Sequence, residues 1–200
     1  EASFKVDIEG FKDELNAQKM RARAARNDMQ SMNTQNEAYL NFTKESVFVG
    51  YDNLEFTAKV IGLFNNNTLV EKASFNTVIV FDKTPFYAEM GGQVGDEGCI
   101  ILNGETFDVL NTFKLPNGQH AHLVNLGETS IHNDDEVTLK VNEEFRNNVC
   151  SNHSATHLLN ESLRKVLGSH VVQQGSLVTN ERLRFDFNHY NNLSNEEILS

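Results

Sequence analysis

Two histidines, His153 and His157, have the spacing that most directly predicts chemistry in this sequence. The apolar period around them indicates a helix, and residues four apart lie on the same helix face about one turn apart. Neutral imidazoles are zinc ligands, so the pair has the geometry needed to hold one metal ion. The alternative is a pair of surface or hydrogen-bonded histidines without a metal.

Zinc needs three or four ligands, and this pair supplies two of them. Cys150 precedes the pair on the same helix but lies about 60° away from the histidine face, whereas His170 and His189 follow the helix and could fold back. The chain contains no Cys-x-x-x-His pair, so we expect the missing ligands in sequence beyond Ser200. Ser154 stands where the H-E-x-x-H helix of a metalloprotease has its general-base glutamate, which disfavours that class.

A second candidate region is the glycine-rich stretch 84–98, with glycines at positions 91, 92, 95 and 98. Glycine permits positive φ and lets a backbone approach a partner closely. That partner could be a ligand or merely another strand. The stretch lacks the G-x-G-x-x-G spacing and no helix follows it, so it does not match a dinucleotide-binding fingerprint.

The elements that would position these residues change type along the chain. In residues 4–30 the apolar side chains recur with the period of a helix whose other positions are mostly charged. Residues 31–44 have the composition of a linker. Short β-branched or aromatic runs separated by turn signals then predict a small antiparallel barrel or sandwich. The expected strands are 47–50, 54–63, 77–81, 99–102, 106–113, 120–125 and 137–141.

The period becomes helical again from about Glu143 and stops at Gly168. A strand pair is expected at 171–178 and 182–187, and a capping box from Ser194 to Glu197 starts another helix. The predicted fold class is α+β. We expect an N-terminal helix and linker at 1–43, an antiparallel β-barrel with the glycine-rich loop at 44–141, and an α/β core at 142–200.

The composition excludes several classes of protein. A net charge of −11 argues against binding nucleic acid through global electrostatics. No apolar run approaches about 18 residues and no signal-peptide pattern is visible, so we expect no membrane partner and a cytoplasmic location. Cys99 and Cys150 are expected to be buried free thiols. One local basic patch is present, formed by Lys19, Arg21, Arg23 and Arg26.

Three stretches of the chain resemble one known family. Residues 152–178, which begin Asn-His-Ser-Ala-Thr-His, and the run Arg-Leu-Arg-Phe-Asp-Phe at 182–187 look like the editing domain of alanyl-tRNA synthetase. The run Phe-Tyr-Ala-Glu-Met-Gly-Gly-Gln-Val-Gly-Asp at 86–96 resembles the glycine-rich motif of the same family. Residues 6–11 and 21–25 are similar to the end of its tRNA-recognition helices. The matches occur in family order and span nearly the whole chain.

This resemblance implies a fold, an activity and partners. The fold would be a β-barrel followed by an α/β editing core of the threonyl/alanyl-tRNA synthetase type, truncated at its C-terminus. The activity would be hydrolysis of the ester in seryl- or glycyl-tRNA mischarged onto tRNA(Ala), within an enzyme that ligates alanine to tRNA using ATP. ATP and magnesium would bind in an upstream catalytic domain. The partners would be tRNA(Ala) and mischarged aminoacyl-tRNA, with no DNA and no membrane.

The resemblance also implies roles for individual residues. His153 and His157 match the family's first pair of zinc ligands, and Gln173 matches a polar residue that arranges substrate or water, which makes it the candidate catalytic residue. Ser154 sits where many members have a threonine that senses the substrate's side chain. The other candidate substrate-binding residues are Gly91, Gly92 and Gln93.

The chain departs from the family pattern in two ways. Met90 replaces a glycine, and the second zinc pair, Cys-x-x-x-His, is absent, so we expect a half-site and an inactive isolated fragment. The N-terminal match favours a piece of the synthetase over a free-standing trans-editing protein with the same motifs. A non-catalytic tRNA-binding module with structural histidines is the other alternative. An unrelated metallohydrolase would need a complete ligand set within the chain.

Overall fold

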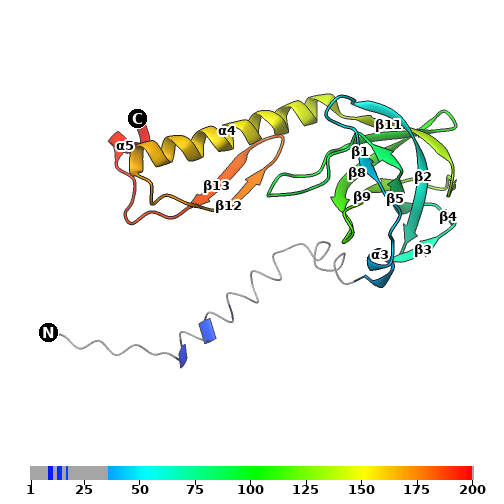
Figure 1. Ribbon diagram of the computed structural model, residues 1–200, viewed down its shortest axis with the longest axis horizontal. Coiled ribbons are helices and arrows are strands. Elements are labelled where there is room, and N and C mark those ends of the chain that lie inside the picture. The colour runs from blue at the N-terminus through cyan, green and yellow to red at the C-terminus, as the bar shows by residue number, and fades with distance from the viewer. Residues whose placement is uncertain (1–8, 11–12, 15–16, 18–35, 200) are drawn as a thin grey trace.

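The computed structural model describes residues 9–10, 13–14, 17 and 36–199 (Figure 1). The five described positions before residue 36 are helical. The rest of the helix predicted over 4–30 lies outside the described residues, and so does the whole of the basic patch at 19–26.

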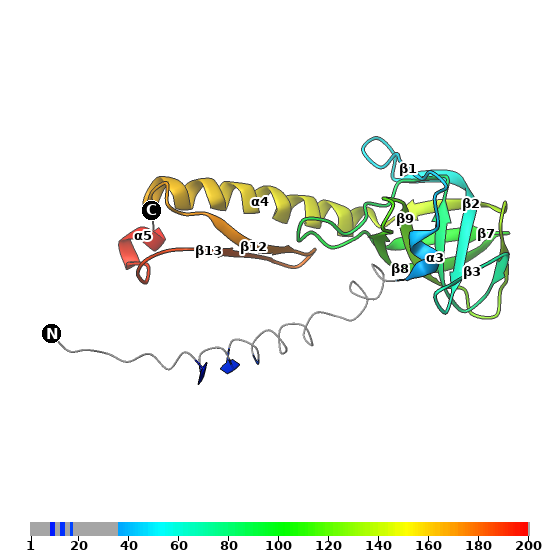
Figure 2. The same cartoon turned by 60° about the horizontal axis from the view of Figure 1, so that its bottom comes forward.

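Antiparallel strands form a closed barrel of six strands in the order β11-β7-β8-β9-β5-β2, with β11 paired back to β2 (Figures 1 and 2). In the closing pair Val137 lies opposite Ala58. Closure leaves none of these six strands with a free edge. The barrel strands are β2 (Glu55–Asn65), β5 (Asn76–Phe81), β7 (Gly98–Leu102), β8 (Glu105–Lys114), β9 (His120–Asn125) and β11 (Glu136–Val141).

Shorter strands extend the ends of the barrel. β1 pairs in parallel with β6, β4 pairs with β10, and β3 forms a hairpin with β2. The expected strands are all present, with ends that agree to about two residues, whereas β3, β4, β6 and β10 were not predicted because two- or three-residue strands have no measurable period. Their bounds are β1 (Val47–Phe48), β3 (Thr68–Val70), β4 (Lys72–Ala73), β6 (Lys83–Thr84) and β10 (Ile131–His132).

Every second side chain of a barrel strand points inward, and these side chains fill the barrel interior. Val60, Ile79, Phe81, Ile100 and Leu139 are completely buried there. This continuous apolar filling makes the barrel a packed core and not a channel.

A second apolar cluster lies on the outside of the barrel. Tyr39 and Phe42 flank the end of helix α3 (Glu37–Leu40), and both rings meet the edge of the Phe64 ring at centroid distances of 4.8 and 5.4 Å. The Gln119 side chain donates hydrogen bonds to the carbonyls of Phe42 and Lys44. Residues 36–42 fall within the stretch expected to be a linker, yet they pack against the barrel because their two aromatic rings find an apolar surface there.

A long helix, α4 (Glu143–Leu167), leaves the barrel, and a strand pair runs beside it (Figure 1). The Asn142 side chain caps the helix by accepting from the backbone N–H of Phe145, and Gly168 follows its last turn with a φ of 113°. β12 (Gln173–Val178) and β13 (Leu183–Phe187) pair antiparallel and contact α4. We call these elements, with α5 (Asn195–Leu199), the α4 arm.

These observations confirm the predicted α+β class. Of the two predicted architectures, barrel and sandwich, the strands form the barrel. The capping box at α5 is also present, because Ser194 N donates to the Glu197 carboxylate and Glu197 N donates to the Ser194 hydroxyl. The division into 1–43, 44–141 and 142–200 stays a prediction. Among the described helices, none combines the length and the apolar character needed to cross a bilayer.

Candidate metal and substrate site

Helix α4 brings the two histidine rings together, as their spacing predicts. The Nε2 atoms of His153 and His157 lie 3.0 Å apart. Two nitrogens bound to one tetrahedral zinc at about 2.0–2.1 Å would lie about 3.4 Å apart. A small side-chain adjustment therefore suffices for the pair to hold one zinc ion through both Nε2 atoms.

The described residues supply only half of a zinc shell. No group of three or more His, Cys, Asp or Glu side chains that could hold a metal occurs in the described part of the chain. His170 and His189 do not fold back to the pair; they contact each other at 2.9 Å, and His170 also stacks on Tyr190. The donor set fits zinc as two ligands of an incomplete site.

The glycine-rich loop makes a tight turn whose backbone only glycine tolerates easily. Met90 and Gln93 exchange two backbone hydrogen bonds, and Gly91 and Gly92 between them have φ values of 64° and 87°. A Cβ on Gly92 would lie 2.4 Å from the carbonyl oxygen of Ser176, whereas one on Gly91 would meet nothing within 4 Å. The close approach at Gly92 is therefore to strand β12.

Backbone hydrogen bonds hold this turn against β12. Val178 N donates to the Gly92 carbonyl at 2.8 Å, and Val94 N donates to the Val178 carbonyl at 3.0 Å. The loop that leaves the barrel thus continues the β12–β13 pair. Of the two partners considered for the loop, ligand or strand, the structure shows the strand.

Gln93, at the end of this turn, reaches the histidine pair. Its side-chain oxygen Oε1 lies 2.6 Å from Nδ1 of His153, and the residue is only 6% exposed. The substrate-binding role expected for Gln93 stays a prediction. The structure places its oxygen against the histidine ring.

The remaining predicted site residues lie in two places. Ser154 is exposed on α4 and borders a pocket that His153 also lines. Gln173 begins β12, where its amide donates to the hydroxyl of Ser176 at 3.1 Å. The assignment of Gln173 to substrate or water, and of Gly91 and Gly92 to substrate, stays a prediction.

A buried ion pair anchors α4 to the barrel. Arg146 Nε donates to both carboxylate oxygens of Asp96 at 2.9 and 3.0 Å, and its terminal nitrogens donate to the carbonyls of Gly50 and Pro85. Asp96 is 1% exposed and also accepts from the backbone N–H of Tyr87. Sequence reasoning did not single out Arg146, although a charged residue near the start of the histidine helix was a signal that could have prompted it.

A pocket of about 300 Å³ lies between the barrel and α4, beside the histidine pair. Its size is near the lower end for small-molecule sites. Aromatic rings form part of its wall. Burial, with Tyr51 and Asp96 nearby, raises the pKa of the Tyr87 phenol above its ordinary value. The lining residues are Phe48, Tyr51, Tyr87, Gln93, Arg146, Cys150, His153 and Ser154.

The aromatic part of this wall was not predicted, because Phe48 and Tyr51 follow no motif and Tyr87 was noted only within the glycine-rich motif. The expectation of two buried thiols is wrong, since Cys150 is exposed where α4 borders the pocket and Cys99 is only half-buried. Both remain free thiols.

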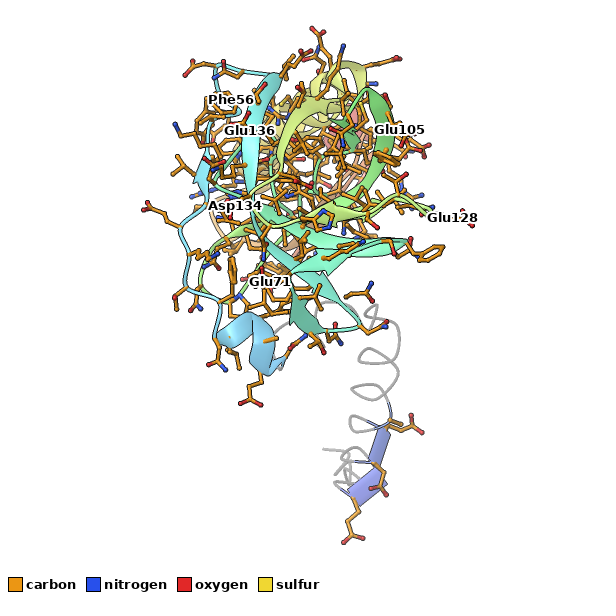
Figure 3. The ribbon with its side chains drawn as sticks, turned by 90° about the vertical axis from the view of Figure 1, so that its right-hand side faces the viewer. Phe56, Glu71, Glu105, Glu128, Asp134 and Glu136 are labelled. Carbon is orange, nitrogen blue, oxygen red and sulfur yellow. The ribbon has the colours of Figure 1, made fainter. Side chains whose placement is uncertain are left out.

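The end of the barrel remote from α4 is acidic. Figure 3 looks at this end, where carboxylates are spread over strands and turns. Some of these carboxylates have a basic neighbour. The Lys59 Nζ atom lies 3.8 Å from a carboxylate oxygen of Asp134, whose side chain is 83% exposed. Carboxylates spread in this way repel a polyanion. The labelled acidic residues are Glu71, Glu105, Glu128, Asp134 and Glu136.

Comparison with known proteins places this chain in a family. The profile of the family described as tRNA synthetases class II (A) matches residues 1–145. The chain is 45% identical over 195 residues to an alanine–tRNA ligase of Bacillus velezensis, 47% over 201 residues to one of Acholeplasma laidlawii and 43% over 197 residues to one of Listeria monocytogenes.

These matches cover 96%, 100% and 98% of the chain, respectively, and 22% of each relative. The chain thus spans about 22% of the length of the curated relatives it matches. It belongs to the family of class II (A) tRNA synthetases, and the relatives that it resembles along its whole length are alanine–tRNA ligases.

Proposed function

We propose that this chain supplies half of a zinc-dependent site that hydrolyses the ester of seryl- or glycyl-tRNA(Ala), within an enzyme that ligates alanine to tRNA. The observation that carries the proposal is the histidine pair of α4 at the edge of a pocket of about 300 Å³ between barrel and arm. ATP and magnesium would serve the ligation in a part of the enzyme outside this chain. The cytoplasm, where tRNA is charged, is the proposed location.

The residues of the chain have separate roles in this proposal. His153 and His157 hold zinc through their Nε2 atoms, and the bound metal would polarise an ester carbonyl or lower the pKa of a water. The Ser154 hydroxyl borders the same pocket, where it can sense the side chain of the aminoacyl group. Gln173 orients substrate or water from the start of β12.

Two observations support a synthetase over a free-standing editing protein and orient the tRNA. The family match begins at residue 1, upstream of the barrel and of the shared editing motifs. The acidic far end of the barrel disfavours phosphates there, so the tRNA would approach from the side of α4.

The test uses the complete zinc-loaded synthetase and measures hydrolysis of seryl-tRNA(Ala). His153→Ala is expected to lower the hydrolysis rate at least about 100-fold, as loss of a group that supports the transition state does, while alanine ligation persists. The matched control is His132→Ala, because His132 is exposed on the barrel beside Asp135. Unchanged hydrolysis in His153→Ala would refute the proposal, and salt-dependent tRNA binding without any hydrolysis would favour a binding module instead.

A further inference from the structure

We propose that Gln93 is a positioning residue that fixes the tautomer and the orientation of His153. The glycine-rich loop would then serve the histidine pair directly, as the element that presents this one side chain. The contact is 2.6 Å long and joins residues that are 60 positions apart in the sequence. Its consequence for tRNA editing rests on the function proposed above, whereas its consequence for the histidine ring does not.

The chemistry of the contact assigns the proton. A glutamine side-chain oxygen only accepts hydrogen bonds, so Nδ1 of His153 must donate to it. A neutral imidazole carries a single N–H, which leaves the lone pair on Nε2. That Nε2 faces the Nε2 of His157 at 3.0 Å. Ligation through Nε2 needs this tautomer, and metal-binding histidines generally have their other ring nitrogen held by such an acceptor.

The same geometry distinguishes the two histidines. In the metal-free chain, this proton assignment makes His157 the donor, through its own Nε2–H, across the 3.0 Å between the two Nε2 atoms. His157 must therefore change tautomer before it can ligate through Nε2, while His153 is already in the ligating form. His153 is half-buried and His157 is exposed, so solvent can exchange the proton of the second ring readily.

The loop has little freedom to move the glutamine away. Gln93 is 6% exposed, its backbone closes the turn with Met90, and the adjoining Val94 is bonded to Val178 on β12. A buried side chain held at its own turn and at the next residue keeps its rotamer, which is the condition for orienting a partner ring.

The loop also contacts α4 at a second point, which lies on the same face of the helix as His153. Asp96 lies three residues after Gln93, and its partner Arg146 lies seven residues before His153. Seven residues are about two helical turns, so Arg146 and His153 share one face of α4. The ion pair therefore fixes the helix against the loop, and Gln93 fixes the ring.

The first experiment needs no variant. Nitrogen-15 NMR of the histidine rings in the metal-free 200-residue chain, at a pH where the imidazoles are neutral, reports which ring nitrogen carries the proton. We expect His153 as the Nδ1–H tautomer and His157 as the Nε2–H tautomer. Finding His153 as Nε2–H would overturn the proposal outright.

The second experiment compares Gln93→Met with Gln93→Glu. Methionine keeps the length but accepts no comparable hydrogen bond, and glutamate keeps an acceptor oxygen. We expect Gln93→Met to move His153 toward Nε2–H and to weaken binding of zinc alone, measured against a chromophoric chelator, by about 10–100-fold. Gln93→Glu should retain the tautomer and the affinity. Equal zinc affinity in Gln93→Met and the parent chain would contradict the proposal.

The matched control is Gln174→Met, because Gln174 is exposed on β12 and contacts only the nearby Val172 carbonyl among the contacts described. Gln174→Met should change neither the tautomer of His153 nor the affinity for zinc. If Gln93→Met alters tautomer and zinc affinity as expected while His153→Ala leaves editing by the complete synthetase intact, the editing function fails and the positioning role stands. The reverse pattern rejects the positioning role alone.

Discussion

The barrel and the α4 arm bury their apolar surface to very different extents. The barrel closes on itself and encloses completely buried residues such as Val60 and Phe81. In α4 only Val149 and Thr156 are buried, and Leu158 is 70% exposed. The barrel is thus a self-sufficient scaffold, whereas the arm carries the histidines and depends on the barrel through a few specific contacts. The following predictions test this difference, from the largest expected effect to the smallest.

Loss of the ion pair at the junction should have the largest effect. Asp96→Ala leaves the Arg146 side chain, which is only 13% exposed, without its carboxylate partner, and breaking a buried pair typically costs about 3–5 kcal/mol. Urea unfolding measures this loss of stability. The matched control is Glu55→Gln in the exposed pair with Lys140, 3.6 Å apart, where we expect about 0–1 kcal/mol. Similar values for the two variants would show that α4 is not anchored by Asp96.

Acid should weaken the barrel through its buried histidines. Burial lowers the pKa of His122 to about 3 and that of His120 to about 4, below the unfolded value of 6.5. The unfolded chain therefore binds more protons below about pH 6.5, and stability falls as the pH decreases from there toward 4. Each histidine contributes up to about 1.4 kcal/mol per pH unit.

This pH dependence is measured by denaturant unfolding at several pH values. His122 is held by the Thr84 hydroxyl and the Ile79 carbonyl in the barrel wall, so His122→Asn is expected to lower stability at neutral pH and to flatten the acid slope. A stability that stays constant between pH 7 and pH 5 in the parent chain would argue against two neutral buried rings.

The docking of the loop on β12 should distinguish two adjacent glycines. Gly91→Ala meets no atom within 4 Å, so only its positive φ is costly, about 1–2 kcal/mol. Gly92→Ala also needs a positive φ, of 87°, and in addition collides with the Ser176 carbonyl at 2.4 Å. We expect a larger destabilisation for Gly92→Ala, together with faster hydrogen exchange at Val178 N, which bonds to Gly92. Equal effects at both positions would mean that the loop does not rest on β12.

Truncation on the exposed face of α4 should have the smallest effect. Leu158→Ala is expected to change stability by no more than about 0.5 kcal/mol, because the side chain is mostly in solvent. In the barrel, Phe81→Ala serves as the contrast and should cost about 3–5 kcal/mol. Thermal or urea unfolding compares them, and a cost for Leu158→Ala close to that of Phe81→Ala would show that the arm has a core of its own.

Much of the fold and part of the site could be predicted from the sequence, because these features depend on local periods and end signals. Short β-branched or aromatic runs between turn signals identified the barrel strands, and the helical period with Gly168 identified α4. The four-residue spacing alone placed His153 and His157 together, since helix geometry decides it.

Other features were decided only by the tertiary structure. The closure of β11 on β2, the packing of Tyr39 on Phe64 and the pocket at the junction all join segments that are distant in sequence. Periodicity reports which face of an element is apolar, but it does not report which other element covers that face.

The candidate site also combines features that the sequence determined with features that only the tertiary structure decided. The sequence by itself determined that two imidazoles share a helix face and that a glycine-rich loop precedes that helix in the chain. Only the tertiary structure decided that Gln93 of that loop bonds to His153 across 60 positions and that Asp96 bonds to Arg146 across 50. The physical reason is that these hydrogen bonds form where the closed barrel and the capped helix α4 meet in space. No local sequence propensity encodes the place of that meeting.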